Sequence, residues 1–244
     1  PSYLRPYIKS DEKLISLDIK NSQPYFLYAL IKDNPSIHSE ELEWFGELVV
    51  SGTLYEEMAK RYRELTGYNR TRNQMKLLMY RVFFSKNDGF IKQKAFYGEL
   101  FPTIMAFINQ TNKAKNNTLA IMLQRMESNA VLDVIMPLLQ AEGIIPFTIH
   151  DSFICMESEA VRIREIFVER LAMMFGVAPA MHMDYVLPEI EEEELAVWDD
   201  EFLKEINGEE EVQGEETPVV IDLLPQSSPE EIRMLMDKLV KGKA

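Results

Sequence analysis

The stretch that decides the fold is Ile144-Ile-Pro-Phe-Thr-Ile-His-Asp-Ser-Phe-Ile-Cys-Met156, in which two apolar runs flank the polar tripeptide His150-Asp151-Ser152. Short runs rich in β-branched and aromatic residues predict the two strands of a tight hairpin. The Asp151 carboxylate is then expected at the hairpin tip, ionised and with its direction fixed by the strands. This placement suits a metal ligand, although a turn-forming aspartate beside a strand-end histidine has the same sequence.

A second carboxylate belongs to an apolar run far upstream, Leu14-Ile-Ser-Leu-Asp18-Ile19. The run predicts a strand, and the segment from Ser22 to Lys32 predicts a helix with Pro24 in its first turn, where a missing N–H costs nothing. Asp18 therefore leaves a strand and precedes a helix. That position suits either a helix-capping residue or a second metal ligand.

Arg72, Lys76, Tyr80 and Phe84 recur every four residues in the segment from Asn69 to Ser85, which contains no Gly or Pro. Steps of four drift by only about 40° each on a helix, so the four side chains share one side of it. A guanidinium, an ammonium and two rings in this order can read a triphosphate and a base. The alternative is a basic amphipathic helix on a solvated surface.

Together the three segments resemble, in order and in spacing, motifs A, B and C of the family A DNA polymerases and of the related single-subunit phage RNA polymerases. The resemblance covers residues 1–188, and includes Leu4-Arg-Pro-Tyr7 before motif A and a segment similar to the glutamine-bearing helix before motif C, Leu123-Gln-Arg-Met-Glu-Ser-Asn129. The chain departs from the family at Phe84-Ser85, where Tyr-Gly is usual. It also departs at Ser152, where the DNA enzymes usually carry Glu and the phage RNA enzymes carry Ser.

The resemblance implies an α+β fold, namely a right-hand polymerase palm in which helices back a small antiparallel sheet, with helical fingers inserted at residues 50–110. Helical patterns are also predicted over residues 52–65, 93–109, 117–140 and 157–175, and a strand over residues 180–186. After Pro188 the composition becomes acidic. We therefore expect a polymerase body at 1–188, an acidic linker at 189–216 and an amphipathic helical segment at 217–244.

The chain begins at Pro1, a short distance before the motif A match. In the family a thumb, and often a 3′ to 5′ exonuclease domain, comes before this point. We therefore expect the sequence to be a piece or a processed product of a longer protein.

The implied activity is that of a DNA-directed DNA polymerase, a template-directed nucleotidyltransferase in which a primer 3′-hydroxyl attacks the α-phosphate of a dNTP and pyrophosphate leaves. Two Mg²⁺ ions, for which Mn²⁺ is a substitute, are expected on Asp18, Asp151 and the Ile19 carbonyl. Lys76 is expected to protonate the leaving pyrophosphate, so Asp18, Asp151 and Lys76 are the catalytic candidates. The nucleotide-binding candidates are Arg72, Lys76, Tyr80 and Gln23, and the template and primer candidates are Phe84, Gln124 and His150.

The choice between DNA and RNA synthesis depends on the groups that crowd the ribose 2′ position. Gln23 stands where the phage RNA polymerases have Gly, and Phe84 lacks their Tyr hydroxyl, so both residues favour deoxynucleotides. Ser152 and the spacing from Asp18 to Ser22 favour a DNA-directed RNA polymerase, which stays the alternative. The family's steric-gate glutamate has no clear counterpart, because the alignment puts Tyr25 in its place.

Two alternatives of another class are also open. One is a catalytically idle palm that serves as a nucleic-acid-binding scaffold, and the retention of both aspartates with Arg72 and Lys76 argues against it. The other is a helical binding protein in which the motifs are coincidental, and it predicts that Asp18 and Asp151 lie far apart.

The formal net charge of −14 is unevenly distributed. Residues 189–216 hold fourteen acidic residues and one lysine, whereas residues 60–94 hold ten basic residues and two acidic ones. An acidic chain therefore remains compatible with primer-template DNA and dNTPs as partners, and the tail is a candidate arm for a protein partner.

A single cysteine, Cys155, excludes an internal disulfide and is typical of a reducing compartment. The sequence has no signal peptide and no run of 18 apolar residues, so we expect no membrane association. A soluble protein of the bacterial cytoplasm, encoded by the host or by a phage, fits these observations.

Overall fold

The computed structural model describes residues 10–115, 117–149 and 152–186. The predicted acidic linker and C-terminal segment lie outside the described residues. The described part is a helix-rich α+β fold with one antiparallel sheet of four strands. The expected fold class is confirmed at that level.

The sheet has the order β2 (Phe147–Ile149), β3 (Ser152–Met156), β1 (Leu14–Ile19), β4 (Met181–Tyr185). β1 therefore lies in the middle, with both of its neighbours taken from the last third of the described chain. Asp18 is opposite Ser152 on β3 and opposite His182 on β4. Because directly opposite residues of antiparallel strands point to the same face, these three side chains share one face of the sheet.

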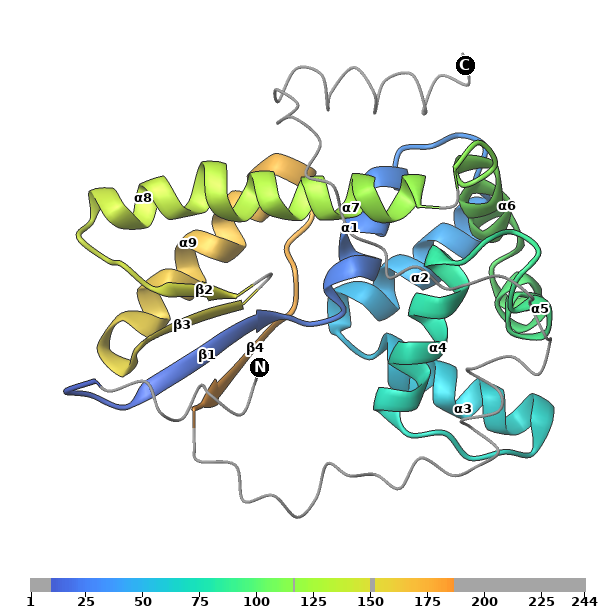
Figure 1. Cartoon of the computed structure of the whole chain (residues 1–244), viewed down its shortest axis with the longest axis horizontal. Helices are drawn as coiled ribbons and strands as arrows, with labels where there is room; N and C mark the ends of the chain where they lie inside the picture. Colours follow the sequence, from blue (N-terminus) through green and yellow to red (C-terminus); the bar gives the residue numbers. More distant parts are fainter. Residues whose placement is uncertain (1–9, 116, 150–151, 187–244) are drawn as a thin grey trace, which may run out of the picture. The chain divides into compact units, whose positions relative to one another are not determined.

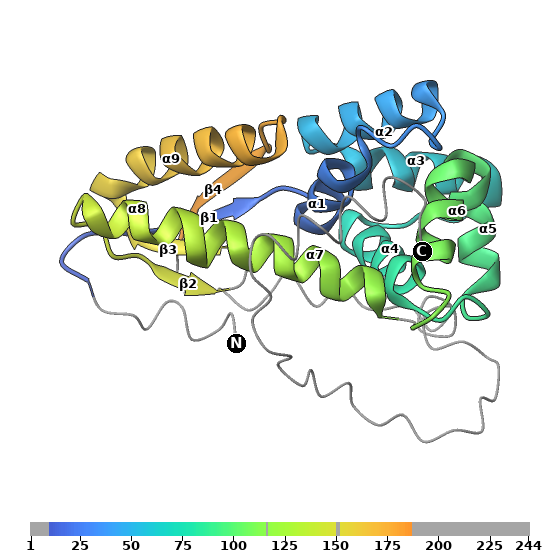
Figure 2. The same ribbon diagram turned by 90° about the horizontal axis from the view of Figure 1, so that it is seen from above.

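The other face of the sheet is covered by α9 (Glu157–Phe175), as Figures 1 and 2 show. Leu17 and Phe153 are paired on that face and are completely buried. The Phe153 ring lies 5.1 Å from the ring of Phe167 on α9, in an edge-to-face contact. The alternation along β1 thus directs Ile15, Leu17 and Ile19 into the core and Asp18 away from it.

The remaining helices form two groups (Figures 1 and 2). A cluster beside the sheet contains α1 (Ser22–Ile31), α2 (Ser39–Ser51), α3 (Leu54–Thr66), α4 (Arg72–Phe84), α5 (Ile91–Leu100) and α6 (Pro102–Thr111). A long helical run then returns from the cluster to the sheet and consists of α7 (Thr118–Ser128), the π-helix η2 (Asn129–Ile135) and α8 (Met136–Ala141).

Two buried polar residues fasten the cluster together. Glu41 on α2 accepts hydrogen bonds from the backbone N–H groups of Thr103 and Ile104, at 3.0 and 2.6 Å, and so caps the first turn of α6. Asn112 donates to the Phe83 carbonyl at 3.0 Å and accepts from the Leu119 N–H at 3.0 Å. The end of α4 and the start of α7 are thereby held to the end of α6.

The structure differs from the sequence expectations in three elements. α2 was not predicted. The helical stretch expected at residues 93–109 is divided at Phe101, because Pro102 has no N–H to continue α5 and instead begins α6. The helix expected at residues 117–140 contains seven π-helical residues.

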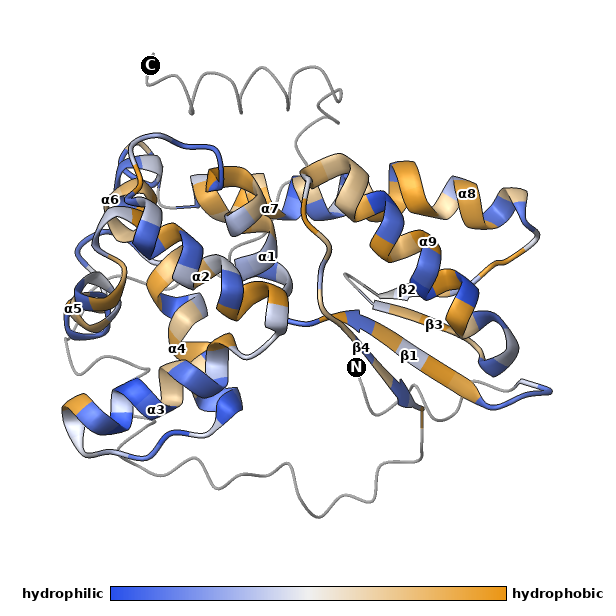
Figure 3. Cartoon of the chain, turned by 180° about the vertical axis from the view of Figure 1, so that it is seen from behind, coloured by the Kyte–Doolittle hydropathy of each residue, from blue (hydrophilic) through white to orange (hydrophobic). Residues whose placement is uncertain are grey.

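The hydropathy of an element agrees with its place in the fold. In Figure 3, β1 is mostly hydrophobic and α3 mostly hydrophilic, as expected for a central strand and a peripheral helix. No helix in the ranges that the structure describes is long and apolar enough to cross a membrane.

Candidate functional site

A cavity of about 610 Å³ lies where the end of β1 meets α1, α3 and α4. Its strand wall contains Asp18, Ser152 and His182, the three residues that the sheet register brings to one face. The imidazole of His182 is itself paired with the carboxylate of Asp184 on the same strand, with Nε2 2.5 Å from Oδ2. The wall therefore combines a carboxylate, a hydroxyl and an imidazole.

The corner between β1 and α1 forms the floor of the cavity. The Lys20 N–H donates to the Ala180 carbonyl at 2.8 Å, which fixes this corner to the segment before β4. The aliphatic part of the Lys20 side chain passes so close to Gly52 that a Cβ at Gly52 would lie 2.6 Å from Lys20 Cδ. Gly52 also has a φ of +76°, so both backbone conformation and space require glycine there.

Asn21 completes this corner in the left-handed conformation, with φ of 54°. The residue is only 4% exposed, and within the part of the chain that the structure describes neither its Oδ1 nor its Nδ2 has a hydrogen-bond partner. A buried polar atom without a partner costs about 1 to 3 kcal/mol. Asn21 is also one of the residues that line the cavity.

The helical wall is provided by α4. Thr71 caps this helix in a capping box with Gln74, so the helix begins at Arg72. Arg72, Lys76 and Tyr80 all line the cavity, as three consecutive turns of one side of α4 should. The Lys76 Nζ lies 5.7 Å from the centre of the Tyr80 ring, and that ring lies 5.8 Å from Phe84.

The start of α3 supplies the last two lining residues of interest. The Arg72 Nε donates to the Glu56 carboxylate at 2.9 Å, and the guanidinium lies 5.3 Å from the centre of the Tyr55 ring. Burial raises the pKa of Tyr55 well above its usual value, and the neighbouring Tyr80 adds to this effect. The Tyr55 phenol is therefore a neutral wall for the cavity, and Glu56 is the carboxylate that faces Arg72.

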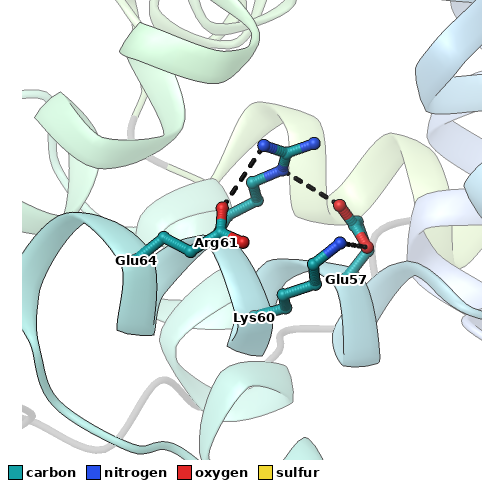
Figure 4. Close-up of polar contacts among 4 residues, drawn as sticks. All are labelled: Glu57, Lys60, Arg61 and Glu64. Carbon is teal, nitrogen blue, oxygen red and sulfur yellow. Dashed lines mark hydrogen bonds and ion pairs between the residues drawn. The ribbon is translucent and has the colours of Figure 1, made fainter.

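Other charges on α3 are paired with each other. Glu57 contacts Lys60 and Arg61 at 3.7 and 2.9 Å, and Arg61 also contacts Glu64 at 3.3 Å (Figure 4). The basic excess counted over residues 60–94 leaves out Glu56 and Glu57, which precede that window. In the folded chain these two carboxylates pair with bases of the window, so the positive charge available to a ligand is smaller than the count indicates.

Several predicted site residues meet in the cavity and others do not. Asp18, Ile19, Arg72, Lys76 and Tyr80 line it. Phe84 and Gln124 are outside the lining, and Gln124 is exposed on α7. His150 and Asp151 lie outside the described residues.

Gln23, the residue predicted to crowd the ribose 2′ position, contacts α7. It is absent from the described lining of the cavity, and its Nε2 donates to the Glu127 carboxylate at 2.8 Å. The same carboxylate oxygen accepts from the Ser22 hydroxyl at 3.1 Å. Tyr25, the aligned counterpart of the family's steric gate, is completely buried and donates to the Val177 carbonyl at 2.9 Å.

Sequence reasoning missed four residues of this region: Asn21, Glu56, Glu127 and His182. A signal existed for Asn21, because an asparagine between a strand and a helix is a common left-handed corner. No local pattern identifies the other three, since each is brought to the site by a contact between distant segments.

No protein-family model matches the sequence, and no curated protein matches it. The structure is similar to the "POL domain of Pol1 from M. smegmatis complex with DNA primer-template and dNTP", with a TM-score of 0.51 and 12% sequence identity. The fold is polymerase-like. The match covers 73% of this chain and 40% of the Pol1 chain, so this chain spans less than half of the protein that it resembles.

The donor set is compatible with a hard divalent cation. Asp18 offers a carboxylate, and the Ser152 hydroxyl and the Asn21 amide oxygen line the same cavity. Among the described residues no group of three His, Cys, Asp or Glu side chains is close enough to hold a metal. Mg²⁺ keeps several water ligands and needs few carboxylates, so a sparse set of oxygen donors fits it better than it fits Zn²⁺.

Proposed function

We propose that the chain is a template-directed nucleotidyltransferase, specifically a DNA-directed DNA polymerase of the family A type. The observation that carries the proposal is that Asp18 from β1 lines the same cavity as Arg72, Lys76 and Tyr80 from α4. A carboxylate facing two cations and a ring across a cavity of about 610 Å³ suits a nucleoside triphosphate and its metal. The polymerase-like fold supports the same assignment.

The roles of the residues follow from their chemistry. Arg72 and Lys76 bind the triphosphate, and Lys76 donates a proton to the departing pyrophosphate. The Tyr80 ring lies against the nucleotide, with Phe84 toward the templating base. Asp18, Asp151 and the Ile19 carbonyl would hold Mg²⁺, which would lower the pKa of the primer hydroxyl and neutralise phosphate charge. Gln124 and His150 contact the ends of primer and template.

Asp151 itself lies outside the described residues, and its neighbour in the sequence supports its proposed role. Ser152, the next residue along the chain, is the direct partner of Asp18. We propose that the Asp151 carboxylate would share the metal ions with Asp18.

Primer extension on a hairpin template with Mg²⁺ tests the function, with deoxynucleotides and ribonucleotides supplied in parallel to the wild type, Asp18→Ala and Asp151→Ala. Extension with deoxynucleotides that each substitution reduces by about 10³-fold or more is the expected outcome, because the metal ions lose a ligand. Extension with ribonucleotides alone would identify an RNA polymerase. DNA binding without extension in either arm, and unaltered in the two variants, would identify a scaffold.

Gln23→Gly tests the preference for deoxynucleotides. If Gln23 crowds the 2′ position, the glycine variant should use ribonucleotides more readily, and the ratio of kcat/KM values for dNTP and NTP should fall. Because Gln23 is hydrogen bonded to Glu127, Glu127→Gln is the matched control that disturbs this contact and keeps the side chain of residue 23. An unchanged ratio in Gln23→Gly contradicts the steric argument.

A further inference from the structure

Asn21 carries a buried amide that makes no hydrogen bond with any described residue. It is the residue before α1, yet its side chain does not cap the helix, and it is only 4% exposed. Buried amides in folded proteins nearly always make hydrogen bonds. Because Asn21 lines the cavity, the missing partner is expected to be a ligand that enters it.

The backbone conformation alone does not account for this asparagine. A left-handed residue is needed at the corner, and glycine would satisfy that need without burying an amide. The other non-glycine residue with positive φ in the described part, Phe90, shows that the chain also tolerates side chains without an amide in this conformation. The amide of Asn21 therefore needs an explanation beyond φ.

The surroundings of Asn21 specify the charge of the ligand. Lys20, Arg72 and Lys76 line the same cavity, and the uncapped first turn of α1, a helix of ten residues, begins directly after Asn21. N–H groups at a helix start and nearby cations both favour an anion. An amide nitrogen adds a donor for an anionic oxygen, while the amide oxygen accepts from a water or a hydroxyl.

We propose that Asn21 is a further substrate-binding residue, whose Nδ2 donates to a non-bridging oxygen of the triphosphate and whose Oδ1 accepts from a water molecule. This proposal rests on the proposed function, because it assigns a contact within the same nucleotide site. It gives the strand-to-helix corner, and not only α4, a part in holding the triphosphate.

Calorimetric titration of the whole chain, bound to a primer-template whose primer ends in a dideoxynucleotide, tests the contact without any turnover. The ligands are inorganic triphosphate with Mg²⁺ and the matching dNTP with Mg²⁺. The proteins are the wild type, Asn21→Gly, Lys76→Ala as the weakened reference, and Phe90→Gly as the control for a glycine at a left-handed position outside the cavity. Thermal unfolding of each variant reports whether it folds.

We expect Asn21→Gly to unfold at the temperature of the wild type or above it, and to bind both ligands with a Kd about tenfold higher, the usual effect of removing a hydrogen bond to a charged group. Phe90→Gly should bind like the wild type. A wild-type Kd in Asn21→Gly, while Lys76→Ala binds more weakly, would overturn this inference and leave the proposed function intact. Weaker binding of the dNTP but not of inorganic triphosphate would also overturn it, since the contact would then be with the sugar. A wild type that binds neither ligand would overturn the proposed function itself.

Discussion

At the scale of single residues, the pairing of Arg72 with Glu56 places a carboxylate where a phosphate is proposed to bind. Both side chains are about half exposed, so the ion pair is weak and can be replaced by a more highly charged partner. Glu56 thus competes with the triphosphate for the guanidinium.

Glu56→Gln should therefore tighten nucleotide binding by about threefold at low salt, because the competing charge is removed. Glu57→Gln is the matched control, since Glu57 is on the same helix but pairs with Lys60 and Arg61. Titration of the dNTP at two ionic strengths measures the effect, which salt should reduce. Weaker binding in Glu56→Gln would mean that Glu56 orients Arg72 instead of competing for it.

Residues on α4 could be placed from the sequence because helix periodicity is local. The spacing of four that unites Arg72, Lys76 and Tyr80 survives in any fold that keeps the helix, and all three line the cavity. The position of Gln23 could not be read in this way, because its side chain follows a hydrogen bond to Glu127, which is 104 residues away in the sequence. The roles of these residues toward a nucleotide stay predictions.

At the scale of elements, the cap that Glu41 provides for α6 joins two helices of the cluster through one side chain. One buried carboxylate accepts from two backbone N–H groups and from the Thr103 hydroxyl, the last at 2.7 Å. Hydrogen bonds to a charged acceptor are stronger than those between neutral groups, and a negative charge at a helix start is favoured.

Glu41→Gln should lower the free energy of unfolding by about 2 kcal/mol, because the amide offers one acceptor oxygen and no charge. Glu40→Gln, at the neighbouring exposed position in the first turn of α2, should change it by less than about 0.5 kcal/mol. Urea unfolding of the two variants measures the difference. If both variants lost the same free energy of unfolding, the stabilisation would come from negative charge in the first turn of α2 and not from the cap on α6.

The elements differ in how far the sequence determines them. The predicted bounds of α9 are confirmed, because acidic residues occupy its first turn and Gly176 ends it. α2 has recognisable signals as well, with Glu40 and Glu41 in its first turn and buried Phe45 and Val49 one turn apart, but Gly46 obscures them. That glycine exists for a tertiary reason, since a Cβ there would lie 2.5 Å from the Tyr28 ring. The π-helix likewise depends on packing, which no local pattern reports.

At the scale of the whole molecule, burial of ionisable groups in the core sets the response to alkali. Cys155 in β3 is 3% exposed, and burial, with a smaller effect of Glu159, raises the pKa of its thiol from 9.0 to about 12. Below pH 9 the thiol is protonated in both states and contributes no pH dependence. Between pH 9 and 12 only the unfolded chain loses the proton, so stability falls as the pH rises.

The free energy of unfolding should therefore fall more steeply with pH in the wild type than in Cys155→Ala, by about 1.4 kcal/mol per pH unit. Urea unfolding at pH 9, 10 and 11 checks this. Tyr25 and Tyr55, whose pKa values burial also raises, are present in both proteins and do not affect the comparison. Parallel curves for the two proteins would show that the thiol ionises in the folded state as easily as in the unfolded one.

The strand order also constrains how the chain can assemble during synthesis. β1 is made before both of its partners, β3 and β4, so its native hydrogen bonds must wait until residues 152–185 have left the ribosome. The helices of residues 22–111 pack through contacts between segments that are much closer along the chain. They can therefore form before β1 has paired with another strand. Asp18 is thus among the first site residues to be translated, whereas the sheet that positions it is among the last parts to form.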